Sequence, residues 1–258
     1  MQPMKVASLN LLQDKKYASV LCYPKYDPEE TTKRITQLER LGVTAVHFTG
    51  EKKAFDLPVL GKGCVGIVVV ADTKTGQAAL KIRRVDADRK KMEHEAEMLA
   101  KANSLGIGPR FIAEEKDFLL MEFIDGSLLP NWVAHLKGRN TKKRIQNALL
   151  DILEQCYRLD RSGLDHGELS RAPKHVIVDM LDKPRLVDFE TASTRRRTSN
   201  VTSIAQYLFM KSQLARDLRG KLGHIDQEAL LAKVKSYKQK STRQNFTAIL
   251  ETCKLTQQ

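Results

Sequence analysis

A glycine-rich stretch constrains this chain more than any other feature of its sequence. Residues 59–71 read Val-Leu-Gly-Lys-Gly-Cys-Val-Gly-Ile-Val-Val-Val-Ala, with glycines at the spacing G-x-G-x-x-G. Glycine has no Cβ, so the backbone N–H groups of such a loop can approach a bound phosphate closely. The spacing alone is weak evidence, because simple turns match it by chance and two unrelated nucleotide-binding folds share it.

The residues after the last glycine distinguish these two folds. A dinucleotide-binding fingerprint opens a helix directly after its third glycine. Here a β-branched run begins at Ile67, a polar turn follows over 72–77, and a second apolar segment covers 78–82. This order predicts strand, glycine loop, strand, turn and a further strand that carries Lys81. The same arrangement occurs in protein kinases, so it favours a loop that folds over the phosphates of ATP.

Residues 1–57, ahead of the glycine loop, are expected to form a small β-α-β extension. Residues 17–23 read as a strand, Asp27 as the N-cap of a helix that ends at Gly42, and residues 43–48 as another strand. Such an extension could recruit a substrate or cap the next sheet. We favour the structural interpretation because nothing in it carries chemistry.

A glutamate is predicted to lie on the buried face of the helix that follows Lys81. That helix starts at Asp86 or Asp88 and runs to about residue 104, and Glu95 shares the face of the apolar Met92. A carboxylate on an inward face is costly unless it is paired. Lys81 is the expected partner; the alternative is a glutamate at the edge of the face that reaches solvent.

The second half of the chain is predicted to be mainly helical. A strand over 118–123 breaks at 124–126, before the remaining helices. These helices are expected over 129–136, from Thr141 to about Leu159, over 201–209 with Ser199 or Asn200 as the cap, over 225–238 and over 242–254.

Between these helices two short strands flank polar loops that carry carboxylates. The loop 164–175 contains His166-Gly167-Glu168-Leu169 and leads into the strand 176–178, and residues 185–187 run into Asp188-Phe189-Glu190. A polar loop before one strand and an acidic residue after the next are where a kinase keeps its catalytic base and its metal ligand.

Together these residues resemble the protein-kinase-like superfamily over about residues 59–210. The likeness is to its small atypical members: the RIO type, the compact kinase of the tRNA-threonylcarbamoylation complex, and archaeal serine/threonine kinases of similar size. It implies an α+β, two-lobed kinase-like fold. Residues 58–123 would form the N-lobe, and residues 124–258 a reduced helical C-lobe that ends in basic helices.

The resemblance also implies roles for individual residues. Lys81 would bind the α- and β-phosphates, Glu95 would orient Lys81, and Asp188 would hold a metal that bridges the phosphates. Glu168 stands where the family has its catalytic aspartate. The residues implied to bind ATP are Gly61, Lys62, Gly63, Cys64, Val65, Gly66 and Val68 in the loop, Lys81 and Glu95, and Met121, Glu122 and Phe123 at the hinge beside adenine.

Three departures from the family pattern bear on activity. Glu168 is longer than aspartate by one methylene, which carries its carboxylate about an ångström further. His175 takes the place of a metal-binding asparagine, two residues later than the family spacing, and is an unusual ligand for magnesium. Glu190 replaces the glycine of Asp-Phe-Gly and is either a second metal carboxylate or a structural acid. The implied metal ligands are therefore Asp188, His175 and Glu190, with magnesium expected and manganese as the alternative.

Charge and composition limit the kinds of partner that we expect for this chain. The net charge is +13, and residues 191–258 carry 13 Lys and Arg against 4 Asp and Glu. Such a basic C-terminal face would attract RNA, a ribonucleoprotein or an acidic protein, unless it is simply a soluble surface. No secretion signal or apolar run of about 20 residues is evident, and the four cysteines match no metal spacing. We therefore expect a cytoplasmic protein without a membrane partner.

The sequence leads to one main hypothesis and two alternatives. The main hypothesis is an ATP-dependent phosphotransferase, an atypical serine/threonine protein kinase that acts on a protein or on itself. One alternative is an ATP-binding pseudokinase or slow ATPase that acts as a regulatory or assembly switch on an RNA or ribonucleoprotein. The other is a small-molecule kinase of the aminoglycoside type, which would require an acidic acceptor pocket in a C-lobe that is instead basic.

Overall fold

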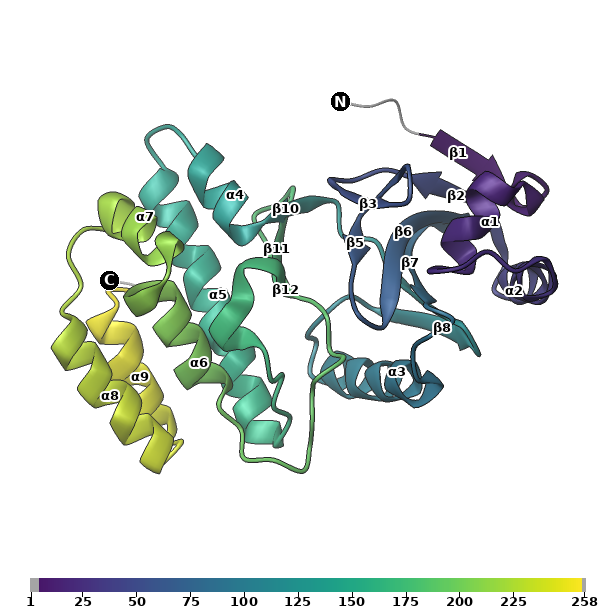
Figure 1. Ribbon diagram of the computed structural model, residues 1–258. Coiled ribbons are helices and arrows are strands. Elements are labelled where there is room, and N and C mark those ends of the chain that lie inside the picture. The colour runs from purple at the N-terminus through teal and green to yellow at the C-terminus, as the bar shows by residue number, and fades with distance from the viewer. Residues whose placement is uncertain (1–4, 257–258) are drawn as a thin grey trace. The chain divides into compact units, whose positions relative to one another are not determined.

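The computed structural model describes residues 5–256 and is an α+β structure with a mostly antiparallel sheet (Figure 1). The chain divides into two compact units. The N-terminal unit runs up to Ala100 and includes Pro109–Ile124, whereas the C-terminal unit consists of Lys101–Gly108 and the residues from Asp125 onward.

One antiparallel sheet organises the N-terminal unit. Its strand order is β1-β2-β6-β7-β9-β8, and the short β5 also pairs with β6. The strands are β1 (Lys5–Ser8), β2 (Val43–Phe48), β5 (Gly61–Lys62), β6 (Gly66–Thr73), β7 (Gly76–Arg83), β8 (Phe111–Glu115) and β9 (Phe118–Glu122). A separate two-stranded ribbon joins β3 (Lys52–Ala54) to β4 (Leu57–Val59). The pairing of β2 with β6 brings the N-terminal residues into the same sheet as the glycine loop.

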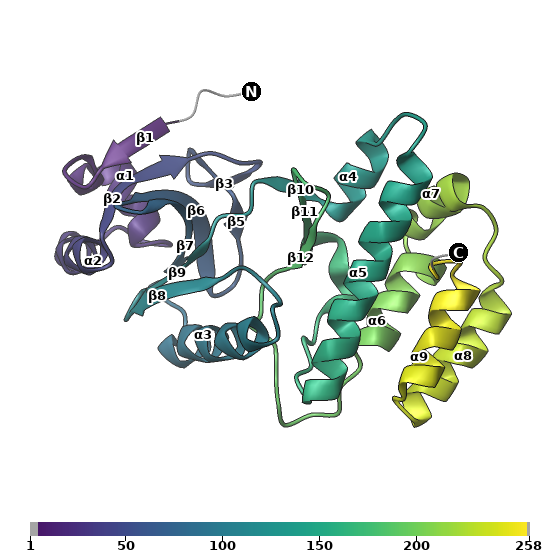
Figure 2. The ribbon, with the colours of Figure 1, turned by 180° about the vertical axis from the view of Figure 1, so that it is seen from behind.

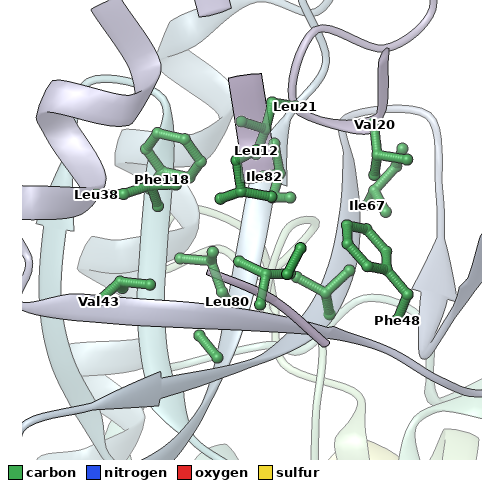
Figure 3. Close-up of a cluster of buried hydrophobic side chains, with 14 of the residues drawn as sticks. Leu12, Val20, Leu21, Leu38, Val43, Phe48, Ile67, Leu80, Ile82 and Phe118 are labelled. Atoms are coloured by element: carbon green, nitrogen blue, oxygen red, sulfur yellow. The ribbon is translucent and has the colours of Figure 1, made fainter. Parts of the chain in front are cut away.

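The core of this unit lies between one face of the sheet and the N-terminal helices α1 (Lys15–Leu21) and α2 (Pro28–Arg40). Figure 3 shows Leu21 and Leu38 from these helices beside Leu80 and Ile82 of β7, and all four side chains are buried. Because successive strand residues point to opposite faces, Lys81 between them points away from this core. The helix α3 (Arg89–Ser104) follows β7 in the chain.

The expected strand over 17–23 is wrong, because residues 15–21 form helix α1. The Asp14 carboxylate accepts a hydrogen bond from the Lys16 N–H at 2.8 Å, which caps the start of this helix. Ala18 and Leu21 are buried and lie three residues apart, so they share one helical face. The first strand of the described residues is instead β1, which pairs with β2.

A buried polar network attaches α2 to the sheet. Arg34 lies 3.3 Å from the Asp117 carboxylate and donates to the carbonyl of Arg83 at 2.6 Å. The guanidinium of Arg83 donates to the same carboxylate at 2.9 Å, as does the side-chain amide of Gln37 at 2.8 Å. Burial alone would raise the pKa of Asp117, but the bond from Gln37 and the charges of Arg34 and Arg83 hold it below its ordinary value.

Helices dominate the C-terminal unit. They are α4 (Leu129–His135), α5 (Thr141–Ser162), α6 (Asn200–Gln206), α7 (Gln213–Leu222), α8 (Gln227–Gln239) and α9 (Arg243–Thr252), with a π-helical turn at Tyr207–Lys211. In Figures 1 and 2, α6 runs beside α5 and α9 beside α8. A small antiparallel sheet joins β10 (Gly126–Leu128), β11 (Val176–Asp179) and β12 (Pro184–Leu186).

The packing of these helices converges on a single carboxylate. Asp160 of α5 accepts hydrogen bonds from the N–H of Asn200 at 2.9 Å, from its side-chain amide at 2.8 Å and from the Tyr237 hydroxyl at 3.0 Å. One buried side chain thus joins α5, α6 and α8. Among residues 5–256, no helix is both long enough and apolar enough to cross a lipid bilayer.

Candidate functional site

The glycine loop forms a tight turn between β5 and β6. The N–H of Gly63 donates to the carbonyl of Gly66 at 2.8 Å, and Gly61 stands opposite Val68 in the ladder. A Cβ on Gly66 would lie 2.9 Å from the carbonyl oxygen of Ile82 and 3.1 Å from the Cγ of Lys81. Only glycine fits there without displacing its neighbours, because the Ile82 backbone carbonyl, and next to it the Lys81 side chain, lie directly against it.

Lys81 and Glu95 form a buried ion pair behind this loop. The ammonium of Lys81 lies 2.5 Å from Oε2 of Glu95, and both side chains are more than 90% buried. Lys81 comes from β7 and Glu95 from the inward face of α3. The pairing that burial of Glu95 requires is therefore present, so this glutamate does not reach solvent. The pair fixes the direction of the lysine beside the glycine loop.

The segment expected to contact adenine ends β9. Met121 faces Ala79 across the ladder with β7, and Glu122 receives the N–H of Arg110 on its carboxylate at 3.0 Å. Within the part of the chain that the structure describes, the N–H and carbonyl of Phe123 make no hydrogen bond.

In the C-terminal unit, one imidazole lies between two carboxylates. Nε2 of His175 is 3.0 Å from Oε2 of Glu168, and its Nδ1 is 3.6 Å from Oδ2 of Asp188. The His175 side chain is 7% exposed, against 44% for Glu168 and 43% for Asp188. The two carboxylates therefore face solvent, while the imidazole that joins them is enclosed.

The backbone at Asp188 is unusual for a residue with a side chain. Its φ is +71°, in the left-handed region that non-glycine residues rarely adopt. Phe189, which follows it, is buried, and its ring packs 4.9 Å from the His166 ring. Such a conformation persists only where the surroundings hold it.

A second carboxylate accompanies Asp188. Oxygens of Asp188 and Glu190 lie within 4.8 Å of one another, with Phe189 buried between them in the chain. Carboxylate oxygens are the donors that magnesium prefers. His175 also remains a predicted ligand, but its two nitrogens point at Glu168 and Asp188.

Buried hydrogen bonds hold the loop that carries Glu168. The Asp165 carboxylate pairs with the guanidinium of Arg196 and accepts the N–H of Ser199 at 2.8 Å. Gly167 has a φ of +93°, and a Cβ there would collide with Arg196. Asp165 is itself buried and engaged in these bonds, whereas Glu168 is 44% exposed, so Glu168 is the carboxylate of this loop that reaches solvent.

His166 is buried, with its ring 5.7 Å from the His175 ring, and is electrically neutral at physiological pH. Burial, together with the charge of the neighbouring His175, lowers its pKa to about 4. Its Nε2 lies 3.1 Å from the carbonyl of Val187, so it ties the Glu168 loop to the segment that precedes Asp188. His166 therefore acts as a structural support of both carboxylates.

Comparison with known proteins yields a relative but no activity. No protein-family model matches this chain. Over 102 residues it is 31% identical to "Uncharacterized protein MJ1211" of Methanocaldococcus jannaschii, an alignment that covers 40% of this chain and 83% of that protein. The chain belongs to the family of this archaeal protein. The name states no reaction, so membership of this family brings neither substrate nor mechanism.

The structure thus gathers the expected residues into two groups. The glycine loop, Lys81 and Glu95 come together in the N-terminal unit, and Glu168, His175, Asp188 and Glu190 in the C-terminal unit. Sequence reasoning missed the pair of Asp165 and Arg196, because 31 residues separate them and no local pattern links them.

Proposed function

We propose that this chain is an ATP-dependent phosphotransferase, an atypical serine/threonine protein kinase that phosphorylates a protein or itself. The observation that carries the proposal is the buried pair of Lys81 and Glu95 directly behind Gly66. A buried lysine held by a glutamate beside a glycine turn suits the binding of ATP phosphates. In this proposal the two units are the lobes of a kinase-like fold and act on the same nucleotide.

The N-terminal unit would bind the nucleotide. The bare backbone of Gly61, Gly63 and Gly66 would approach the phosphates, and the Lys81 ammonium would neutralise the α- and β-phosphate oxygens. Glu95 keeps that ammonium in place at 2.5 Å. The backbone of Phe123 would meet the edge of adenine.

The C-terminal unit would carry out transfer. Asp188 and Glu190 offer carboxylate oxygens within 4.8 Å of each other, which suits a divalent ion such as magnesium, with manganese as the alternative. Such an ion would neutralise charge on the phosphates. Glu168, at 44% exposure, would accept the proton of the attacking hydroxyl, while His175 holds its carboxylate in position.

The same contact supports a second candidate function. Because Glu168 already contacts His175 at 3.0 Å, its carboxylate is partly engaged, which would slow proton transfer. A slow ATPase or pseudokinase whose affinity for an RNA or ribonucleoprotein changes with the bound nucleotide would need the nucleotide site but not a fast catalytic base. The basic residues of 191–258 suit such a partner.

Single-turnover transfer from γ-labelled ATP distinguishes the two functions. The purified chain is incubated with magnesium or manganese, and label on protein and released phosphate are followed separately. The Glu168→Ala variant is run beside Glu251→Gln, which changes an exposed carboxylate of α9 away from the site.

For a kinase, label appears on serine or threonine, falls by about 100-fold or more in Glu168→Ala and is unchanged in Glu251→Gln. Phosphate release without label on protein, or ATP binding without either product, favours the slow ATPase or pseudokinase. Absence of ATP binding in the wild-type chain would refute both functions.

A further inference from the structure

Tyr23 lies beside the glycine loop, although it comes from the N-terminal segment. Its ring centroid is 4.7 Å from the ammonium of Lys62 and 5.1 Å from the guanidinium carbon of Arg84. Both distances fall within the roughly 6 Å over which a cation is attracted to an aromatic ring. Lys62 belongs to the loop itself, and Arg84 directly follows the strand that carries Lys81.

Arg84 in turn forms hydrogen bonds with the tip of the loop. Its backbone N–H donates to the carbonyl of Val65 at 2.9 Å, and its guanidinium lies 3.3 Å from the carbonyl of Gly63. The loop residues between these carbonyls include Cys64, which is exposed. Arg84 thus contacts both sides of the turn, through its backbone N–H and its guanidinium. The Tyr23 ring contacts that guanidinium.

Tyr23 is itself fixed in place. Its carbonyl accepts the N–H of Val85 at 2.9 Å, and its ring packs 5.1 Å from the ring of Phe55. Asp86 also holds the Arg84 guanidinium, at 2.7 Å. The ring is therefore a fixed support that contacts two cationic side chains, those of Lys62 and Arg84.

We infer that Tyr23 is a positioning residue that clamps the glycine loop through Lys62 and Arg84, and thereby prepares it to bind the phosphates of a nucleoside triphosphate. The nucleotide part of this inference rests on the proposed function. The physical reason is entropic: a glycine turn is intrinsically mobile, and holding it in one conformation before binding lowers the cost of ordering it on the ligand.

The chain contains its own reporter of loop motion. Cys64 is exposed at the tip of the loop, whereas the other three cysteines are buried. A nitroxide attached to Cys64 of the full chain reports loop mobility by electron paramagnetic resonance without any nucleotide. A Cys64→Ser chain measures labelling elsewhere. ATP affinity is measured separately on unlabelled protein with magnesium.

Three variants distinguish the effect of the aromatic face of Tyr23 from that of its apolar volume. Tyr23→Leu keeps apolar contact but removes the aromatic face, whereas Tyr23→Phe keeps the face and loses only the hydroxyl. Tyr26→Leu is the matched control, since the cation over that ring, at 5.9 Å, is Lys15, which is not a residue of the loop. We expect greater label mobility and about fivefold weaker ATP binding in Tyr23→Leu, and wild-type behaviour in the other two variants.

Each outcome bears on one claim. Unchanged label mobility in Tyr23→Leu overturns the clamp, and increased mobility with unchanged ATP affinity overturns its link to nucleotide binding. If the label responds but the wild-type chain binds no ATP, the clamp stands and the proposed function fails. Should Tyr23→Leu not fold, Lys62→Gln removes one contact from an exposed side chain and must also increase mobility.

Discussion

His166 is a buried imidazole that supports both candidate catalytic carboxylates. Its pKa is about 4 in the folded chain, against 6.5 for an unperturbed histidine. The unfolded chain therefore binds this proton more tightly than the folded chain does. The contribution of neutral His166 to stability is complete above pH 6.5 and is lost as the pH falls toward 4. From pH 7 to 4.5 that loss is about 2.5 kcal/mol.

Replacement of His166 should remove this pH dependence. We expect the unfolding free energy of wild type to fall between pH 7 and pH 4.5 by about 2.5 kcal/mol more than that of His166→Gln. Urea unfolding at both pH values measures the difference. Because surface carboxylates titrate equally in both proteins, their effect cancels. Parallel losses in the two proteins would show that His166 does not titrate as its burial requires.

At the scale of elements, the spacing of apolar residues predicted long helices correctly but not every short element. The helix expected from Thr141 to about Leu159 is α5, and it ends at Gly163, whose φ of +76° suits glycine. The short apolar run at 17–23 fits strand and helix equally, and packing against the sheet decided for helix. Helix α7 was missed although its apolar residues follow helical spacing after Ser212, whose side chain caps it.

The candidate site was predictable only in part, because some of its contacts join segments that are far apart in the sequence. Burial of Glu95 on a helical face pointed to its pairing with Lys81. The position of His175 between Glu168 and Asp188 depends on how loops pack after β11 and β12 form, which no residue spacing encodes. The contact of Tyr23 with the glycine loop likewise depends on a long-range hydrogen bond, from the Val85 N–H to the Tyr23 carbonyl.

The attachment of α2 to the sheet leads to a prediction about stability. Asp117 balances two buried guanidinium groups, those of Arg34 and Arg83. Asp117→Ala would remove the carboxylate paired with Arg83 and leave buried Arg34 with Glu30 alone, so we expect the unfolding free energy to fall by about 3–5 kcal/mol. Asp56→Ala, at an exposed turn of the same unit, should change it by less than about 0.5 kcal/mol. Urea unfolding would refute the role of Asp117 if the two variants behaved alike.

At the scale of the whole molecule, the proposed function requires both units to act on one nucleotide. Lys81 belongs to the N-terminal unit and Asp188 to the C-terminal unit. Each group would neutralise charge on the same triphosphate, so loss of either should abolish binding rather than halve it. Their effects should therefore not add.

Thermal unfolding with and without ATP and magnesium tests this requirement. At a ligand concentration about 100 times its Kd, binding adds about 2.7 kcal/mol, which raises the Tm of wild type by about 5 °C. We expect no rise in Lys81→Ala, in Asp188→Ala or in the double variant. Lys74→Ala and Asp217→Ala, which change exposed side chains of the β6–β7 turn and of α7, should keep the full rise. If only Lys81→Ala lost it, ATP would be bound by the N-terminal unit alone, and the chain would be a nucleotide-binding switch rather than a kinase.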